Sequence, residues 1–233
     1  MAIPKHIAFI SDGNRRWAKA HSLDIAVGHK KGEKAICDIV AKAKELGVKY
    51  VSFFVWSNEN DKKRSVEEKQ NIANLIEFFV EHEILKLKDI GAKLRILGDK
   101  PSFVTNQLFK FVDRLVSETK DNTGIDVCFY FGYNSRTEIV KAVKSCAADV
   151  QQGRLNIEDI NEDFVRSKFY APDVPDPDIL IRTSGEIRLS NFLLWQLAFT
   201  ELFFVDKYWP DFTGDDLAEI IKQFENRERR YGM

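Results

Sequence analysis

The chain has 233 residues, 44% hydrophobic and 30% charged, which is enough for one domain with a large core or at most two small ones. The 35 lysines and arginines balance the 36 aspartates and glutamates, so no overall basic field favours nucleic acid. The N-terminus lacks the apolar core of a signal peptide and no apolar run could span a bilayer, which predicts a cytoplasmic protein, at most loosely membrane-associated. The cysteines, Cys37, Cys128 and Cys146, form no CxxC pair and are expected to be small apolar fillers.

An apolar run at residues 6–11 predicts a buried strand, and a loop rich in anion-binding groups follows it. The loop reads Ser11-Asp12-Gly13-Asn14-Arg15-Arg16-Trp17. Gly13 and Asn14 can adopt backbone angles closed to most residues, so several N–H groups can point at one anion, and the two arginines add donors for phosphate oxygens. Asp12 would repel a phosphate unless a cation lay between them. The loop therefore predicts a diphosphate bound with Mg²⁺; the alternative is a polar turn with solvated arginines.

Strands and helices alternate along the rest of the chain. Further strands are predicted at residues 50–55, 92–98, 126–131, 178–183 and 201–206. Helices are predicted at residues 29–46, 65–89, 101–119, 136–150 and 213–230, with a short helix at 158–168 inside a polar connection. This alternation predicts a single-domain α/β fold, residues 1–233, with a mostly parallel six-stranded sheet and helices on both faces. The apolar arc of the helix at 65–89 is wide: packing between the sheet and its neighbours explains most of it, and lining a lipid cleft is the alternative.

Two more polar loops follow predicted strands. One comprises residues 56–64, and the other comprises residues 182–191, which contain a glycine, two arginines and several hydroxyl groups. Because open α/β sheets bind ligands at the carboxyl ends of their strands, we expect the three loops to converge there, with Asp12 and Glu201 nearby. The nucleotide motifs GxxxxGK[ST] and GxGxxG are absent from the sequence, so the diphosphate is not expected to be that of ATP or a dinucleotide.

Several ordered motifs resemble those of the cis-prenyltransferases, the family of undecaprenyl diphosphate synthase and isoprenyl transferase. The motifs are Ser11-Asp12-Gly13-Asn14-Arg15-Arg16-Trp17, Gly28-His29-Lys30-x-Gly32, Phe54-x-x-Ser57-x-Glu59-Asn60, Arg182-Thr183-Ser184-Gly185-Glu186-x-Arg188-Leu189-Ser190-Asn191, Glu201-Leu202 and Trp209-Pro210-Asp211-Phe212. The resemblance spans nearly the whole chain.

The resemblance implies a Mg²⁺-dependent transferase of isoprenoid biosynthesis. Such an enzyme adds isopentenyl diphosphate units, with cis double bonds, to an allylic starter such as farnesyl diphosphate. The implied product is a long-chain polyprenyl diphosphate, expected to be undecaprenyl diphosphate, a lipid-carrier precursor for cell-wall synthesis that partitions to the membrane. The family fold surrounds a hydrophobic tunnel and works as a homodimer. Product length depends on tunnel walls that the sequence does not locate, so shorter or longer products remain an alternative.

The family pattern also assigns roles to individual residues. Asp12 would bind Mg²⁺ and help the allylic diphosphate to leave, Glu201 would support the metal, and Asn60 would position the condensing unit and assist proton removal. The residues expected to hold the starter's diphosphate are Gly13, Asn14, Arg15, Arg16 and His29, with Trp17 beside them. Isopentenyl diphosphate would be bound by Arg182, Arg188 and Ser190, and the further substrate-binding candidates are Ser57, Asn58, Glu59, Lys63 and Leu189.

The sequence departs from the family pattern at a few positions. Ile25 replaces an arginine that many bacterial members use on the starter, and Ile187 replaces a histidine near the metal. Asp61 and Arg64 replace an aromatic residue and a proline. The Tyr-Gly-Gly-Arg element reads Tyr133-Asn134-Ser135-Arg136.

Three other functions compete with this one. Trans-prenyltransferases use paired DDxxD motifs, but Asp215-Asp216-x-x-Glu219 occurs once, at a helix start, where the helix dipole explains acidic residues. A non-catalytic subunit of a two-chain cis-prenyltransferase should have lost the Asp-Gly-Asn loop, which is intact. A lipid- or phosphate-binding module without turnover is the third. Finally, the ending Arg230-Tyr231-Gly232 resembles a family terminus that reaches the partner chain's site; a solvated helix end is the alternative.

Overall fold

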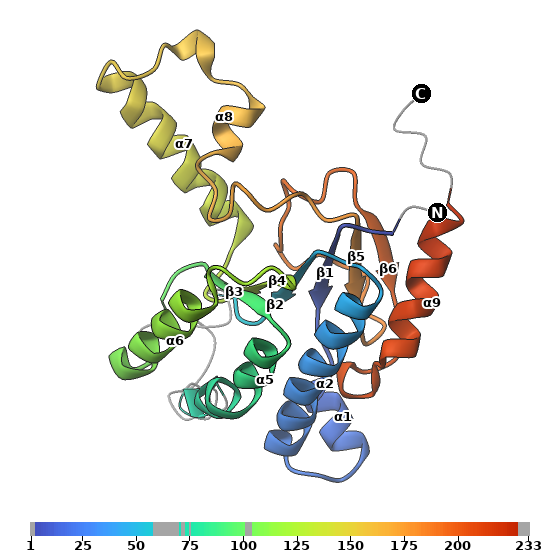
Figure 1. Cartoon of the computed structure of the whole chain (residues 1–233). Helices are drawn as coiled ribbons and strands as arrows, with labels where there is room; N and C mark the ends of the chain where they lie inside the picture. Colours follow the sequence, from blue (N-terminus) through green and yellow to red (C-terminus); the bar gives the residue numbers. More distant parts are fainter. Residues whose placement is uncertain (1–2, 58–69, 71–72, 75, 101–103, 228–233) are drawn as a thin grey trace.

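The sheet that organises the molecule has six strands, all parallel. The computed structural model describes residues 3–57, 70, 73–74, 76–100 and 104–227 (Figure 1). The strand order is β3-β4-β2-β1-β5-β6, and every neighbouring pair is parallel. The strands are β1 (His6–Ile10), β2 (Tyr50–Phe54), β3 (Ala92–Leu97), β4 (Ile125–Tyr130), β5 (Ile179–Arg182) and β6 (Glu201–Phe204). The predicted α/β class and all six strands are confirmed.

The strands are apolar because both faces of the sheet are covered. All five residues of β1 are buried: Ile7 and Phe9 join the core on one face, and Ala8 and Ile10 join a second cluster on the other. Continuous apolar runs, rather than alternating ones, are typical of such doubly covered parallel strands.

One face of the sheet carries a layer of helices. They are α2 (Ile25–Glu45), α5 (Ile84–Asp89), α6 (Asn106–Thr119) and α9 (Gly214–Glu225), which lie on the same side of the sheet in Figure 1. Each presents one apolar stripe, such as Ile36, Ile39 and Val40 of α2, to the larger core cluster.

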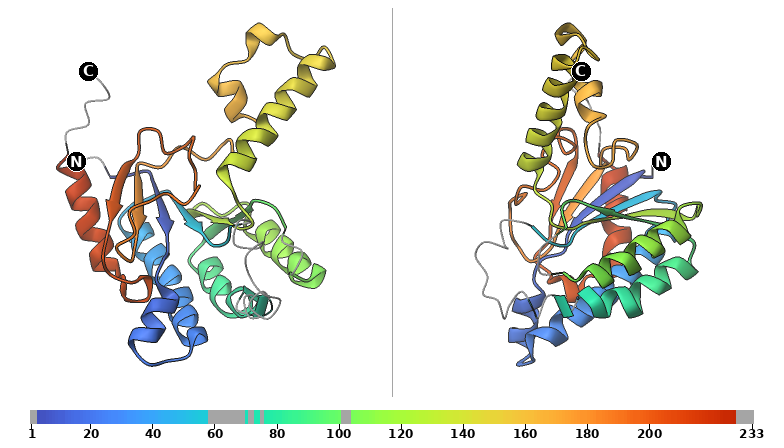
Figure 2. Two further views of the ribbon diagram at one scale, coloured as in Figure 1. Left: turned by 180° about the vertical axis from the view of Figure 1, so that it is seen from behind. Right: turned by 90° about the vertical axis from the view of Figure 1, so that its left-hand side faces the viewer.

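The opposite face is covered differently from the prediction of helices on both faces. Its buried cluster combines strand residues with members of non-helical segments, including Tyr133, Val174 and Phe192. Helices α7 (Ser135–Gln151) and α8 (Glu162–Arg166) instead project from the body as an arm, which Figure 2 shows from two sides. We call these two helices the α7–α8 arm.

Several helix boundaries differ from the sequence prediction. Residues expected to be a polar loop form α1 (Asn14–Ala20), and α2 starts at Ile25 because the Asp24 side chain accepts a hydrogen bond from the Ala26 N–H. Helix α6 starts after the cap residue Thr105. The π-helical turn η1 (Phe79–Glu83) lies inside the helix predicted at 65–89, and η2 (Ile157–Asp159) overlaps the short helix predicted at 158–168, whereas η3 (Trp209–Asp211) was not predicted. The start of the helix predicted at 65–89 lies outside the described residues.

The order of the strands creates a ligand-binding edge. Strand β2 pairs with one edge of β1, and β4 and β3 continue the sheet in that direction. Strand β5 pairs with the other edge of β1, so the direction in which strands are added reverses at β1. In open α/β sheets the carboxyl ends of the strands beside such a reversal form a crevice. The loops after β1 and β5 both leave the sheet at this point.

Candidate active site

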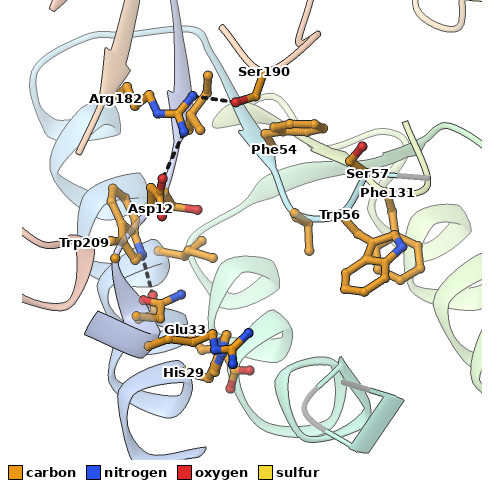
Figure 3. A pocket seen from close by; sticks show the side chains of 18 of the residues that line it. Asp12, His29, Glu33, Phe54, Trp56, Ser57, Phe131, Arg182, Ser190 and Trp209 are labelled. Carbon is orange, nitrogen blue, oxygen red and sulfur yellow. Dashed lines mark hydrogen bonds and ion pairs between the residues drawn. The ribbon is translucent and has the colours of Figure 1, made fainter. Parts of the chain in front are cut away.

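A pocket of about 780 Å³ lies beyond the carboxyl ends of β1, β2 and β5 (Figure 3). Ten of the predicted site residues line it, so the expected convergence of the loops is seen for the residues that the structure describes. These ten are Asp12, Gly13, Asn14, Arg15, Arg16, His29, Ser57, Arg182, Arg188 and Ser190.

Asp12 and Arg182 form the centre of the polar part of the pocket. Arg182 is the last residue of β5, only 3% of its side chain is exposed, and its Nη2 lies 2.9 Å from Oδ2 of Asp12. Thr183 fixes the backbone of Asp12 from the neighbouring strand: its hydroxyl donates to the Asp12 carbonyl at 2.7 Å and accepts from the Asp12 N–H at 3.0 Å. The carboxylate is therefore held rigidly at the junction of two strands while remaining 31% exposed toward the pocket.

Gly13 turns the chain from β1 into α1. Its φ is +109°, and a Cβ at this position would lie 2.6 Å from Oγ of Ser184 and 2.9 Å from Cδ1 of Tyr208. Only glycine satisfies both the backbone angle and the lack of space. The loops after β1 and β5 are in close contact here, which brings their charged side chains together.

Charges alternate along the polar wall. Arg16 bridges two carboxylates: its Nη2 lies 3.2 Å from Oδ1 of Asp12, and its Nη1 lies 2.8 Å from Oε1 of Glu186. Glu186 also pairs with Arg188. The hydrogen bond from Arg188 is the main reason why the pKa of Glu186 lies below its ordinary value. The order Arg182, Asp12, Arg16, Glu186, Arg188 thus places three arginines around two carboxylates, an arrangement that can bind further negative charge.

The loop after β5 is held in a strained conformation. Four of its non-glycine residues, Ser184, Ser190, Asn191 and Leu193, have positive φ angles between 47° and 83°. Hydrogen bonds hold it, including one from Nη1 of Arg182 to Oγ of Ser190 at 2.7 Å. Residues in such sparsely populated conformations cluster at ligand sites because they must present particular groups. In this loop the strain presents Ser190 to the pocket.

The opposite wall of the pocket is largely apolar. Its side chains come from α2, from η1 and from the segments that follow β2 and β4; they include Ile36, Phe79, Trp56 and Phe131. Glu33 of α2 interrupts this wall. The pKa of Glu33 is raised to about 8, mainly by burial and also by the charge of nearby Glu83, against the opposite effect of Lys30. A pocket with one cationic wall and one apolar wall suits an amphipathic molecule with an anionic head.

Three predicted site residues do not line this pocket. Trp17 is buried beside it, where its Nε1 donates to Oδ2 of Asp211 at 2.8 Å. Leu189 packs against the second core cluster. Glu201 begins β6 and pairs with Arg227, so it lies apart from Asp12 within one chain, and its predicted support of the metal stays a prediction. The register pairs Glu201 with Ile179, the first residue of β5. Glu201 therefore lies at the amino ends of the strands, on the order of 10 Å or more from the carboxyl edge of the sheet, where Asp12 lies.

Other predicted positions lie outside the described residues or away from the pocket. The predicted residues Asn58, Glu59, Asn60 and Lys63, the departures Asp61 and Arg64, and the tail from Glu228 fall outside the described residues. Ile25 and Ile187 are 46% and 77% exposed and do not line the pocket. Asn134 caps α7 through a hydrogen bond from the Thr137 N–H.

Several pocket residues were not predicted from sequence. Glu33 and Ile36 belong to the helix predicted at 29–46, and their spacing from His29, four and seven residues, places all three on one face. Phe131 directly follows β4 and Trp56 lies two residues after β2, positions at the carboxyl edge of the sheet that could have marked them as pocket residues. The predicted burial of the three free cysteines is confirmed.

Comparison with known proteins agrees with this geometry. The family described as "Putative undecaprenyl diphosphate synthase" matches residues 10–232. The chain is 43% identical to the isoprenyl transferase of Clostridium perfringens, over 99% of this chain and 90% of that protein. It is 41% identical to the isoprenyl transferase of Bacillus subtilis, over 99% of this chain and 88% of that protein.

Solved structures give the same result. The crystal structure of lavandulyl diphosphate synthase from Lavandula x intermedia, in complex with dimethylallyl diphosphate, superposes with a TM-score of 0.93 and 32% identity, covering 99% of both chains. A probable undecaprenyl diphosphate synthase from Campylobacter jejuni superposes with a TM-score of 0.81 and 28% identity, covering all of both chains.

The protein is thus an enzyme that transfers prenyl groups. More narrowly, the chain belongs to the undecaprenyl diphosphate synthase family, the cis-prenyltransferases, so the predicted resemblance is confirmed. Among the described helices, none has the length and apolar character needed to cross a membrane.

Proposed function

We propose that this protein is a Mg²⁺-dependent cis-prenyltransferase that adds isopentenyl diphosphate units to farnesyl diphosphate and makes undecaprenyl diphosphate. One observation carries the proposal: Asp12 is fixed between Arg182 and Arg16 at the cationic wall of a pocket whose opposite wall is apolar. An allylic diphosphate has the matching parts, a diphosphate head and a hydrocarbon tail. In the reaction the starter's C–O bond breaks, a C–C bond to isopentenyl diphosphate forms, and a proton is lost.

The starter's diphosphate binds at the loop after β1. Arg15, Arg16 and the glycine-initiated start of α1 supply donors, and His29 lies on the adjacent helix α2. The tail then extends along the apolar wall. In this proposal a hydrophobic tunnel continues from that wall.

Isopentenyl diphosphate binds at the loop after β5, through Arg182, Arg188 and Ser190. Ser57, at the end of the segment after β2, lines the same pocket. Asn60 follows it in sequence, so we assign Asn60 the positioning of the condensing unit, with help in removing its proton. An amide is a weak base, so positioning is the larger part of this role.

The side chains around Asp12 fit a magnesium ion that arrives with a diphosphate. Mg²⁺ is typically held by one or two carboxylates together with phosphate oxygens and water. Asp12 offers a carboxylate 31% exposed toward the pocket, and the arginines beside it suit the phosphate groups. When bound, Mg²⁺ would neutralise charge on the departing diphosphate. Arg16 and Arg182 orient the Asp12 carboxylate for this purpose.

The protein acts as a homodimer of single catalytic domains spanning residues 1–233, in the cytoplasm, and releases its product to the membrane. Exposed apolar side chains support an interface: Val143 of α7 is 55% exposed, Ile157 of η2, between α7 and α8, is 67% exposed, and Phe199, just before β6, is 80% exposed. Covering such groups is favourable in water.

One assay tests the proposal. The purified protein is incubated with farnesyl diphosphate, labelled isopentenyl diphosphate and Mg²⁺, and the products are separated by chain length. Labelled products of eleven isoprene units that disappear with a chelator are expected. Labelled products of another length would retain the prenyltransferase and correct the product. If the protein binds both diphosphates but forms no labelled product, the proposal is refuted, and a binding module or a non-catalytic subunit is supported.

A further inference from the structure

Glu33 is a carboxyl group inside the pocket that the proposed reaction does not use. It lies on the pocket-lining face of α2, one turn after His29 and one turn before Ile36; Figure 3 labels it beside His29. Its Oε2 is shielded from solvent and accepts no hydrogen bond from any residue that the structure describes. A buried oxygen without a donor is costly, so a function for it is expected.

The residues beyond Glu33 form the apolar part of the pocket. Ile36 follows on the same helix, and Phe79, the first residue of η1, lines the pocket beside it. Single π-helical turns such as η1 occur often at functional sites. The last residue of this turn is Glu83, a buried carboxylate that pairs with Nζ of Lys86 at 2.8 Å. Glu33 therefore lies where the polar part of the pocket meets the apolar part.

The Glu33 carboxyl group is expected to be largely neutral near pH 7. Burial raises its pKa to about 8, and the charge of Glu83 acts in the same direction, against Lys30. A neutral carboxyl can be covered by hydrocarbon, but it then loses its remaining contact with water and gains no hydrogen bond in return. Any ligand that covers Glu33 with apolar groups therefore binds less tightly than its hydrocarbon area alone would allow.

We propose that Glu33 discriminates among allylic starters by the length of their tails. This inference rests on the proposed function, in which the starter's diphosphate lies near His29 and its tail follows the apolar wall. Glu33 lies a helical rise of roughly 6 Å beyond His29. A five-carbon dimethylallyl tail ends near this point and leaves the carboxyl group in contact with water. A fifteen-carbon farnesyl tail passes it and covers it, so the longer starter bears the cost.

Replacement of Glu33 by an apolar residue should remove this cost selectively. The variant Glu33→Leu offers the farnesyl tail a favourable contact, and Glu33→Met does so with an adaptable side chain if leucine packs poorly. Glu33→Gln keeps the shape and the polar character of the wild-type side chain. Asp38→Leu is the matched control, because Asp38 is an exposed carboxylate on the same helix and lies outside the pocket.

The experiment measures binding and turnover separately. Dissociation constants are determined for dimethylallyl and farnesyl thiolodiphosphates, unreactive analogues in which sulfur replaces the bridging oxygen, and kcat/KM is measured for the two natural starters. We expect the farnesyl-to-dimethylallyl preference to rise about tenfold in Glu33→Leu and Glu33→Met. Glu33→Gln should change it less than about threefold, and Asp38→Leu should leave it unchanged. Thermal melting confirms that each variant is folded.

The two proposals can fail independently. An unchanged preference in folded Glu33→Leu and Glu33→Met would overturn the role of Glu33, as would an equal rise in the Asp38→Leu control. If the wild-type protein extends neither starter, the proposed function fails. The binding constants of the two analogues would still decide whether Glu33 discriminates by tail length.

Discussion

Asp12 and Arg182 lie 170 positions apart in the chain, and Nη2 of Arg182 lies 2.9 Å from Oδ2 of Asp12. The contact joins the ends of β1 and β5, the two strands on either side of the chain reversal in the sheet. Since Arg182 is almost fully buried, the pair fixes the geometry of the pocket as well as its charge.

Asp12→Ala should lose turnover on the order of 10³-fold, because several kcal/mol of charge stabilisation would be absent from the transition state. Binding of farnesyl diphosphate should persist, since the arginines remain. The substitution should lower the free energy of unfolding by about 1–2 kcal/mol. Buried Arg182 loses its carboxylate partner, but the loss is limited because the Asp12 side chain is 31% exposed to solvent. Steady-state kinetics and calorimetry check both points. Asp12→Asn keeps the shape without the charge; near-wild-type turnover in this variant would contradict the metal role.

Gly32→Ala should disturb the starter side of the pocket. A Cβ at this position would lie 2.4 Å from Oδ1 of Asn14 and 3.1 Å from Cδ1 of Trp209. Overpacking should cost about 1–3 kcal/mol, which the better helix propensity of alanine offsets by about 1 kcal/mol. We expect KM for the starter to rise several-fold. In an Asn14→Ala background most of the stability cost should vanish, which a double-mutant cycle in urea measures. Full additivity would show that the clash with Asn14 is not the cause.

Asp216→Asn should lower the free energy of unfolding by about 1 kcal/mol and leave turnover intact. Asp216 completes the capping box with Thr213 at the start of α9 and pairs with Lys207. Burial acts to raise its pKa, but the hydrogen bonds from Lys207 and Thr213 outweigh burial and lower it. Its stabilisation is therefore present above its ordinary pKa and is lost as the pH falls through the lowered value.

Asp215→Asn is the control for this prediction, because Asp215 is exposed and should contribute less than about 0.5 kcal/mol. Urea unfolding and an activity assay are run on both variants and on the double variant. Loss of turnover in a folded double variant would revive a trans-prenyltransferase chemistry that uses these aspartates.

Glu33→Gln should change how stability depends on pH. The pKa of Glu33 is raised to about 8 in the folded chain, so the folded state holds a proton that the unfolded state releases above about pH 4.5. Wild-type stability should therefore fall, through this group, as the pH rises from about 4.5 to 8. Glu33→Gln should gain roughly 2 kcal/mol relative to wild type between pH 5 and pH 8, allowing for partial solvent contact. An equal difference at both pH values in urea unfolding would refute this.

The tail beyond Glu228 should complete the partner's site. Arg227 pairs with Glu201 at the start of β6, so the described chain ends at the sheet edge opposite its own pocket. In a C2 dimer any contribution to the partner's site is reciprocal. A chain with Asp12→Ala and a chain truncated after Glu228 should each be inactive alone. Refolded together, they should recover activity, because some dimers pair an intact body with an intact tail.

Two results would contradict a shared site. Activity that stays at background after mixing would indicate that the tail acts within its own chain. Activity of the truncated chain alone would remove the tail from catalysis.

The sheet and most of the cationic wall could be predicted from the sequence, because apolar strands followed by polar loops are local signals. Helix α1 was missed because Gly13-Asn14 is typical of a turn, whereas Gly13 here precedes a helix. Glu201 was expected near Asp12 from the family pattern, although the strand predicted at 201–206 places it at the start of a parallel strand, at the edge opposite Asp12. Glu33 was not predicted as a pocket residue, because a single carboxylate in a helix is usually solvated and helical periodicity does not distinguish a core from a pocket wall.

The central position of β1 also has a consequence for synthesis of the chain. Its neighbour β2 begins at Tyr50, but its other neighbour β5 begins only at Ile179. During translation, β1 therefore has one open, strongly apolar edge until about three quarters of the chain has been made. Such long-range pairing slows folding and exposes unpaired strand edges to aggregation. Because Arg182 is the last residue of β5, the pair that Arg182 forms with Asp12 is also absent until this point of synthesis.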